Sequence, residues 1–172
     1  MALIVEDGTG LSNADSYISL VDARAFALNY GYSLPVDDSD ANVSLRKGAQ
    51  YVDLFEGSFS GQRLVDTQSL AWPRANAYKC AGRDQIYLPS DSVPLEIQYA
   101  QVIAANFYGL GLDVRANDDG LNVNSKEVVG AVKVSYFDNG KTGKSTEITE
   151  ATDMLSNFMC VGSMFTLQTV RV

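Results

Sequence analysis

The chain has 172 residues, of which 46% are hydrophobic, so it is long enough and apolar enough for one domain with a buried core. Its formal net charge of −8 argues against a protein that binds nucleic acid over its whole surface, although a local basic site stays open. Histidine is absent, which disfavours hydrolytic and metal-dependent chemistry because it is the commonest general base and metal ligand.

The N-terminal sequence and the cysteines bear on the compartment. The opening MALIVEDGTG has no basic leader, and no apolar run approaches the roughly 18 residues of a membrane-spanning helix. Cys80 and Cys160 have no paired spacing. We therefore expect a cytosolic protein with reduced thiols, and a disulfide between the two cysteines is the less favoured alternative.

A short helix is predicted first, over about 20–30. Ser19 can cap its N-terminus, and Gly31 can end it because glycine tolerates a left-handed backbone. Residues 15–18 before it are expected to be extended. A second helix is predicted over about 39–56, where the acidic DDSD at 37–40 marks the start.

The second helix contains Gly48, which costs about 1 kcal/mol relative to Ala and suggests a close approach to another helix. A third helix is predicted from Ser92 and Pro94 to about Leu110. It is apolar except for a polar strip, so we expect it to be central to a core or covered by another subunit. That strip consists of Gln98, Gln101 and Asn106.

The segment between the second and third helices, residues 57–93, is rich in Gly and Pro and is predicted to be irregular. Four aromatic residues argue against disorder there: Phe59, Trp72, Tyr78 and Tyr87.

The C-terminal third is predicted to contain the β structure. Residues 113–127 are polar and favour a flexible surface loop, and VVGAVKVSYFD at 128–138 alternates as a strand does. The turn signal at 138–140 suggests a hairpin. Thr149 is expected to cap a last helix, and the final FTLQTVRV at 165–172 is expected to be extended.

These elements predict a mainly α fold of the α+β class: a small helical bundle with a long irregular middle segment, a small C-terminal β-hairpin and an extended tail. We expect one domain over 1–172. Its parts would be a helical core at about 15–112, the flexible loop at 113–127, and a β element with a C-terminal docking segment at 128–172.

The charge is unevenly distributed along the chain. Residues 61–90 carry four basic and two acidic side chains and are net basic. Residues 1–60 and 91–120 are strongly acidic, and 121–172 are balanced. Trp72 lies in this basic stretch. We favour a core anchor for Trp72. The alternative is a stacking platform for an unpaired base, with Arg63, Arg74 and Arg83 on the phosphates.

No catalytic constellation is apparent. The acids at 37–40 lack the ligand spacing of a calcium loop, and NGKTGK at 139–144 lacks the Walker spacing. Cys80 has no base near it in sequence, so a nucleophilic role is disfavoured. We expect a protein without enzymatic activity, cofactor or metal, with a role in binding or assembly.

Several phrases, in this order, resemble a family of tailed-bacteriophage proteins. They are MALIVEDGTGLSNADSYISLVDARAFALNYG, LRKGAQYVDLFEG, FSGQRL, SLAWPR, VPLEIQYAQVIAA, KEVVGAVKVSY and FTLQTVRV. The resemblance implies two labels: a head–tail adaptor, also called a head completion or connector protein, and a DnaT-like single-stranded DNA-binding protein. The acidic charge favours the first, because a channel that passes DNA gains from a lining that does not attract it.

The favoured label implies a structural protein of the virion neck, made in the host cytoplasm. It would form a ring under the portal, by resemblance a dodecamer, and join head to tail. Expected partners are the portal protein, a tail or nozzle/stopper protein, other copies of the chain, and genomic DNA that passes without specific binding. Expected interface residues are Arg63, Trp72, Arg74, Phe165, Leu167, Val170 and Val172. A replication protein that binds single-stranded DNA is the alternative.

Overall fold

The computed structural model describes residues 2–80, 86–111, 125–128, 132–135 and 148–159. The chain divides into two compact units, one formed by Met1–Leu112 with Ile148–Val172 and the other by Asp113–Glu147. The described residues contain four α-helices and short antiparallel strand pairs, which confirms the predicted α+β class. The expectation of a single domain over 1–172 stays a prediction.

Helix α1 (Leu20–Tyr30) begins and ends where its sequence signals predict. Ser19 accepts a hydrogen bond from the Asp22 amide at its N-terminus, and Gly31 adopts φ 79° after its last residue. Helix α2 (Asp38–Asp53) is capped by Asp37, whose carboxylate accepts from the Ser39 amide at 2.8 Å. A short 3-10 helix, η1 (Glu56–Ser58), follows where the prediction extended α2 to 56.

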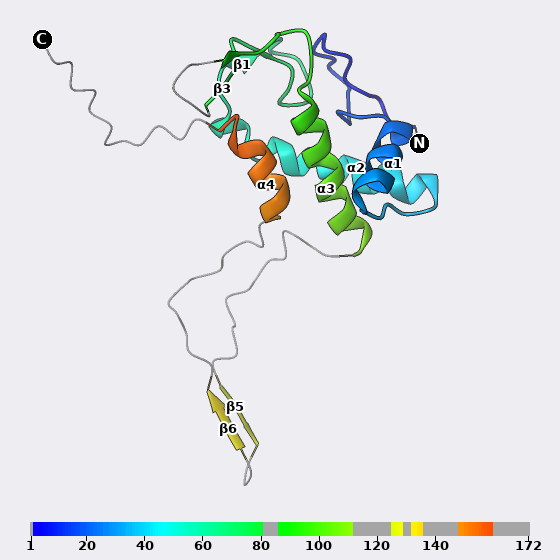
Figure 1. Cartoon of the computed structure of the whole chain (residues 1–172), viewed down its shortest axis with the longest axis vertical. Helices are drawn as coiled ribbons and strands as arrows, with labels where there is room; N and C mark the ends of the chain where they lie inside the picture. Colours follow the sequence, from blue (N-terminus) through cyan, green and yellow to red (C-terminus); the bar gives the residue numbers. More distant parts are fainter. Residues whose placement is uncertain (1, 81–85, 112–124, 129–131, 136–147, 160–172) are drawn as a thin grey trace, which may run out of the picture. The chain divides into compact units, whose positions relative to one another are not determined.

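Helix α3 (Leu95–Gly109) is the centre of the larger unit and contacts each of the other three helices. Figure 1 shows it between α1 and α4, with α2 crossing behind. Gly48 permits the close α2–α3 approach that its position suggested, because a Cβ there would lie 2.3 Å from the Gln101 carbonyl oxygen. The central position predicted for α3 is therefore confirmed.

Within the polar strip of α3, the side chain of Gln101 is fully buried. Its amide oxygen accepts from the Tyr17 amide at 2.9 Å, and its amide nitrogen donates to Ser16 Oγ at 2.7 Å and to the Leu45 carbonyl at 2.9 Å. Gln101 therefore joins three helices or segments that are far apart in the sequence.

Helix α4 (Thr149–Ser156) begins one residue earlier than a Thr149 cap would allow, with Ile148 at the cap position. Tyr51 of α2 contacts this end of the helix, since its hydroxyl accepts from the Ile148 amide at 3.0 Å and lies 2.9 Å from Thr152 Oγ1. This contact fastens the start of α4 to α2.

The middle segment is ordered by two short antiparallel ribbons. Strand β1 (Gln62–Arg63) pairs with β2 (Arg74–Ala75), and β3 (Tyr78–Lys79) pairs with β4 (Ile86–Tyr87). Both strand pairs lie in the stretch predicted to be irregular. The Trp72–Pro73 peptide bond before β2 is cis.

The smaller unit contains strands β5 (Ser125–Val128) and β6 (Val132–Ser135), paired antiparallel with Val128 opposite Val132. Two predictions are wrong here. Residues 125–127 belong to a strand and not to the loop at 113–127, and the chain reverses within the stretch predicted as a single strand. The turn predicted at 138–140 and the tail at 165–172 lie outside the described residues.

Cys80 is disulfide-bonded, and Cys160 is the other cysteine of the chain. The expectation of reduced thiols is therefore wrong for Cys80. Two contacts join the middle segment to the end of α4: the Cys80 amide donates to the Asn157 carbonyl at 2.7 Å, and Met159 forms a β-bridge with Phe59. Residues 157–159 thus lie beside the middle segment.

Candidate nucleic-acid interface

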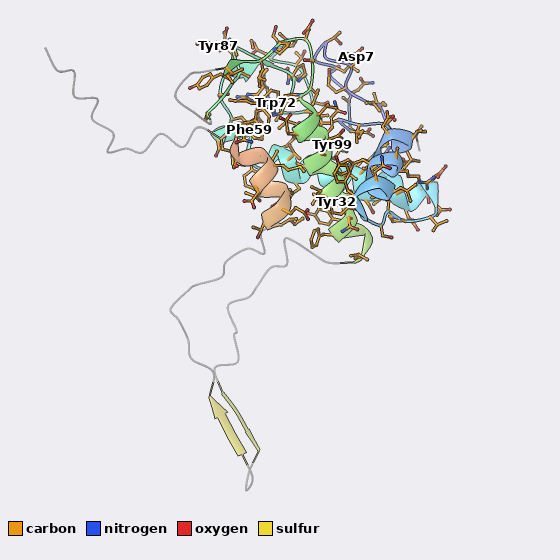
Figure 2. All side chains as sticks on the ribbon, in the orientation of Figure 1. Asp7, Tyr32, Phe59, Trp72, Tyr87 and Tyr99 are labelled. Carbon is orange, nitrogen blue, oxygen red and sulfur yellow. The ribbon has the colours of Figure 1, made fainter. Side chains whose placement is uncertain are left out.

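The Trp72 ring belongs to the core and has no exposed surface. Phe59 and Phe158 meet it edge-on, with ring centroids 5.7 and 5.5 Å away. In Figure 2, Trp72 and Phe59 lie where the middle segment meets the end of α4. The interpretation of Trp72 as a core anchor is confirmed, and its ring is covered against any unpaired base.

Arg74 is the second predicted interface residue, and its side chain is only 5% exposed. Its guanidinium donates to the carbonyls of Ser60 and Gly61, both at 2.9 Å, and lies 3.9 Å from the Glu56 carboxylate. Burial lowers the pKa of Arg74 from its usual value. This arginine holds the turn before β1 in place and presents little surface to a partner.

Arg63, the third, forms a two-pronged ion pair with Glu56 of its own chain and also donates to the Gln68 carbonyl at 2.8 Å. The hydrogen bond from Arg63 holds the pKa of Glu56 below its usual value. Arg63 and Arg74 therefore both form ion pairs with Glu56 of the same chain. The remaining interface predictions, Phe165, Leu167, Val170 and Val172, lie outside the described residues.

The other basic side chains in the described part of the larger unit are also engaged within the chain. Arg24 pairs with Asp38 at 2.7 Å, Arg46 with Asp15 at 2.6 Å, and Lys79 with Glu96 at 2.5 Å, while the Lys47 ammonium lies 5.6 Å from the centre of the Tyr108 ring. Residues 2–80, 86–111 and 148–159 together carry six basic and fourteen acidic side chains. The surface of this body is therefore acidic.

An exposed aromatic surface does occur on the β3–β4 ribbon. Tyr78 and Tyr87 are cross-strand partners with ring centroids 5.8 Å apart. Tyr87 is 64% exposed and its neighbour Ile86 is 59% exposed, and Figure 2 shows Tyr87 at the margin of the body, away from Trp72. We name Tyr78, Lys79, Ile86 and Tyr87 the ribbon surface.

Sequence reasoning noted both tyrosines but missed that they are paired. The signal was the spacing itself, because two aromatic residues flank a short polar stretch, KCAGRDQ, that contains a glycine suited to a turn. Arg83 is part of this connecting stretch and lies outside the described residues.

The opening phrase VEDGTG has a structural role. The Glu6 side chain is buried, and its carboxylate accepts from the backbone amides of Gly8, Gly10 and Leu11 at 2.8–3.0 Å. The loop therefore folds around a carboxylate of its own.

The described residues contain neither a metal-ligand cluster nor a membrane-spanning helix. No group of three or more Cys, Asp or Glu side chains lies close enough together to hold a metal ion. Among the same residues, no helix is both long and apolar enough to cross a membrane.

The chain belongs to the family described as "Putative DnaT-like ssDNA binding protein", whose model matches residues 1–172. This family is one of the two labels that the sequence resemblance implied. No curated protein and no solved structure matches the chain, and no comparison supports the head–tail adaptor label.

Proposed function

We propose that the protein binds single-stranded DNA. The observation that carries the proposal is the family match over the whole chain. No catalytic step is part of the proposal.

The geometry supports the ribbon surface as the contact. Bases stack on exposed aromatic rings regardless of sequence, and Tyr87 is exposed whereas Trp72 is not. The ribbon and its connection also lie within the net-basic stretch at 61–90 and carry Lys79 and Arg83. Lys79 already pairs with Glu96 at 2.5 Å, so Arg83 would supply about one phosphate contact, and the slope of log K against log salt would be about −0.7.

The test is fluorescence anisotropy with a labelled oligothymidine over a series of salt concentrations. We expect weak binding with that shallow slope, and Tyr87→Ala should weaken it about tenfold, since one stacked base contributes about 1–3 kcal/mol. Tyr30→Ala is the matched control, because Tyr30 is 65% exposed but lies on α1. Absence of binding at low salt, or equal losses in the two variants, would contradict the proposal.

A second candidate is the head–tail adaptor, favoured by one observation: the acidic body engages all six of its described basic side chains internally. A ring of such bodies would form a DNA channel that does not retain its cargo. This role would place the protein in the virion neck, in contact with a portal protein, a tail protein and other copies of itself. Electron microscopy of the protein mixed with the portal protein of the same phage would show a ring on the portal. Absence of any association between the two proteins would exclude the role.

A further inference from the structure

Helices α1 and α3 border an open groove of about 490 Å³. Residues 22, 26, 29 and 30 share one face of α1, and residues 95, 98 and 99 share one face of α3, because positions three or four apart lie side by side on a helix. We call this the α1–α3 groove. Its lining residues with an aromatic ring, an amide or a carboxylate are Asp22, Phe26, Asn29, Tyr30, Gln98 and Tyr99.

Three aromatic rings line the groove: those of Phe26, Tyr30 and Tyr99. Phe26 stacks on Tyr99 with ring centroids 4.1 Å apart and an interplanar angle of 15°, and Tyr30 lies 4.5 Å from Phe26. Tyr30 is 65% exposed, so one ring of this cluster is accessible from solvent. Figure 2 shows Tyr99 on α3, beside α1.

Asp22 is the one charged side chain among the lining residues, and no basic side chain lines the groove. Ser19 Oγ donates to Asp22 Oδ2 at 2.6 Å, which orients the carboxylate and leaves lone pairs for further donors. Arg24 of the same helix donates to the Val36 carbonyl at 2.8 Å and pairs with Asp38, and it does not line the groove.

We propose that the α1–α3 groove binds the guanidinium group of an arginine side chain presented by a partner protein. A guanidinium is planar, stacks on an aromatic face and donates in the plane to a carboxylate. Asp22 would supply the carboxylate that pairs with the guanidinium, and Tyr30, about two turns further along α1, would pack against the aliphatic stem of the same arginine. The amide oxygens of Asn29 and Gln98 would be further acceptors.

Charge complementarity decides the class of occupant. Asp22 is the one charged lining residue of the groove, and the described part of the body carries fourteen acidic against six basic side chains. The groove therefore favours a cationic segment over a phosphate backbone. A lysine ammonium would gain the same attraction but lacks the planar fork of donors. The inference does not depend on single-stranded DNA binding at the ribbon surface.

The test is an NMR titration of the full-length protein with the capped tripeptide Gly-Arg-Gly. We expect saturable chemical-shift changes on the groove-facing residues of α1 and α3, with a Kd in the millimolar range, roughly 1–10 mM. The matched peptide Gly-citrulline-Gly has the same shape without the charge, and it should bind at least about fivefold more weakly.

Variants of the full chain separate the contributions. Tyr30→Ala and Asp22→Asn should each weaken the arginine peptide about threefold to tenfold. Tyr87→Ala, on the ribbon, should leave its affinity unchanged. Circular dichroism of each variant checks that α1 remains folded, because Asp22 also lies in the first turn of that helix.

Three results would overturn the proposal. Equal binding of the citrulline peptide would mean that the groove recognises a flat group and no charge. Chemical-shift changes in the groove caused by an oligothymidine would make it a base-binding site. Absence of saturation with the arginine peptide at tens of millimolar would leave the groove without this ligand.

Discussion

Trp72 is enclosed by Phe59 and Phe158, so its loss leaves a cavity that neighbouring segments cannot easily fill. We expect Trp72→Ala to lower the free energy of unfolding by about 3–5 kcal/mol, as large-to-small core substitutions do. Urea denaturation followed by circular dichroism measures the loss. Tyr87→Ala should stay within about 0.5 kcal/mol of the natural chain, because Tyr87 is exposed. A loss below 1 kcal/mol at Trp72 would contradict the core assignment.

Asp53 connects α2 to two distant segments. Its carboxylate accepts from the Tyr17 hydroxyl and, at 3.2 Å, from the Ala71 amide. Burial raises the pKa of Asp53 to about 6 from a usual value of 3.8. The folded state therefore binds this proton more tightly than the unfolded state does, and its contribution to stability is lost as the pH rises from about 4 to about 6.

The substitution Asp53→Asn removes this titration while keeping an acceptor oxygen for Tyr17 and Ala71. We expect the variant to gain stability relative to the natural chain as the pH rises from 4 to 7, by about 2 kcal/mol. Denaturant unfolding at several pH values gives the comparison. Two curves that stay parallel across this range would show that Asp53 does not titrate there.

At the scale of elements, the packing of α2 on α3 depends on the missing side chain at Gly48. A Cβ there would lie 2.3 Å from the Gln101 carbonyl oxygen and 3.1 Å from the Ala105 amide nitrogen, both backbone atoms. Although Ala favours helix by about 1 kcal/mol, we expect Gly48→Ala to destabilise the protein by about 1–3 kcal/mol, since the two helices would have to separate.

Gly57→Ala is the matched control, because a Cβ there meets nothing within 4 Å. Thermal unfolding of the two variants should give a clear drop in Tm for Gly48→Ala and little change for Gly57→Ala. Equal melting temperatures would contradict the close helix approach.

Elements with local signals were predictable from the sequence. Helix α1 matches its prediction because Ser19 and Gly31 act within their own turn of chain. The role of Gln101 was not predicted, because its partners, Ser16, Tyr17 and Leu45, are remote in the sequence. No periodicity in α3 could reveal them.

The candidate sites divide in the same way. Tertiary packing exposes Tyr87 and buries Trp72. The sequence does not distinguish them, because both are aromatic residues in the same irregular, net-basic stretch. The ribbon surface could have been suspected from the flanking tyrosines, whereas the α1–α3 groove requires two helices to be placed side by side. The reversal between β5 and β6 was missed because the alternation that begins at Val132 was taken to extend back over the apolar run at 128–131.

At the scale of the whole molecule, the disulfide of Cys80 links the middle segment to a distant part of the chain. A crosslink between distant residues restricts the unfolded chain and stabilises the fold by about 2–4 kcal/mol. We expect dithiothreitol to lower Tm, and Cys80→Ser without reductant to match the reduced protein. A thiol count of two in the untreated, denatured protein would contradict the disulfide.

With Cys160 as the partner, this bond makes the backbone from residue 80 to residue 160 a closed covalent ring that includes α3, α4 and the smaller unit. A protease that cuts once inside the ring opens it without releasing a fragment. Such a nicked chain should migrate as one band on a denaturing gel and separate into two only after reduction. The molecule would thus keep its C-terminal end attached after a cut that would divide a linear chain.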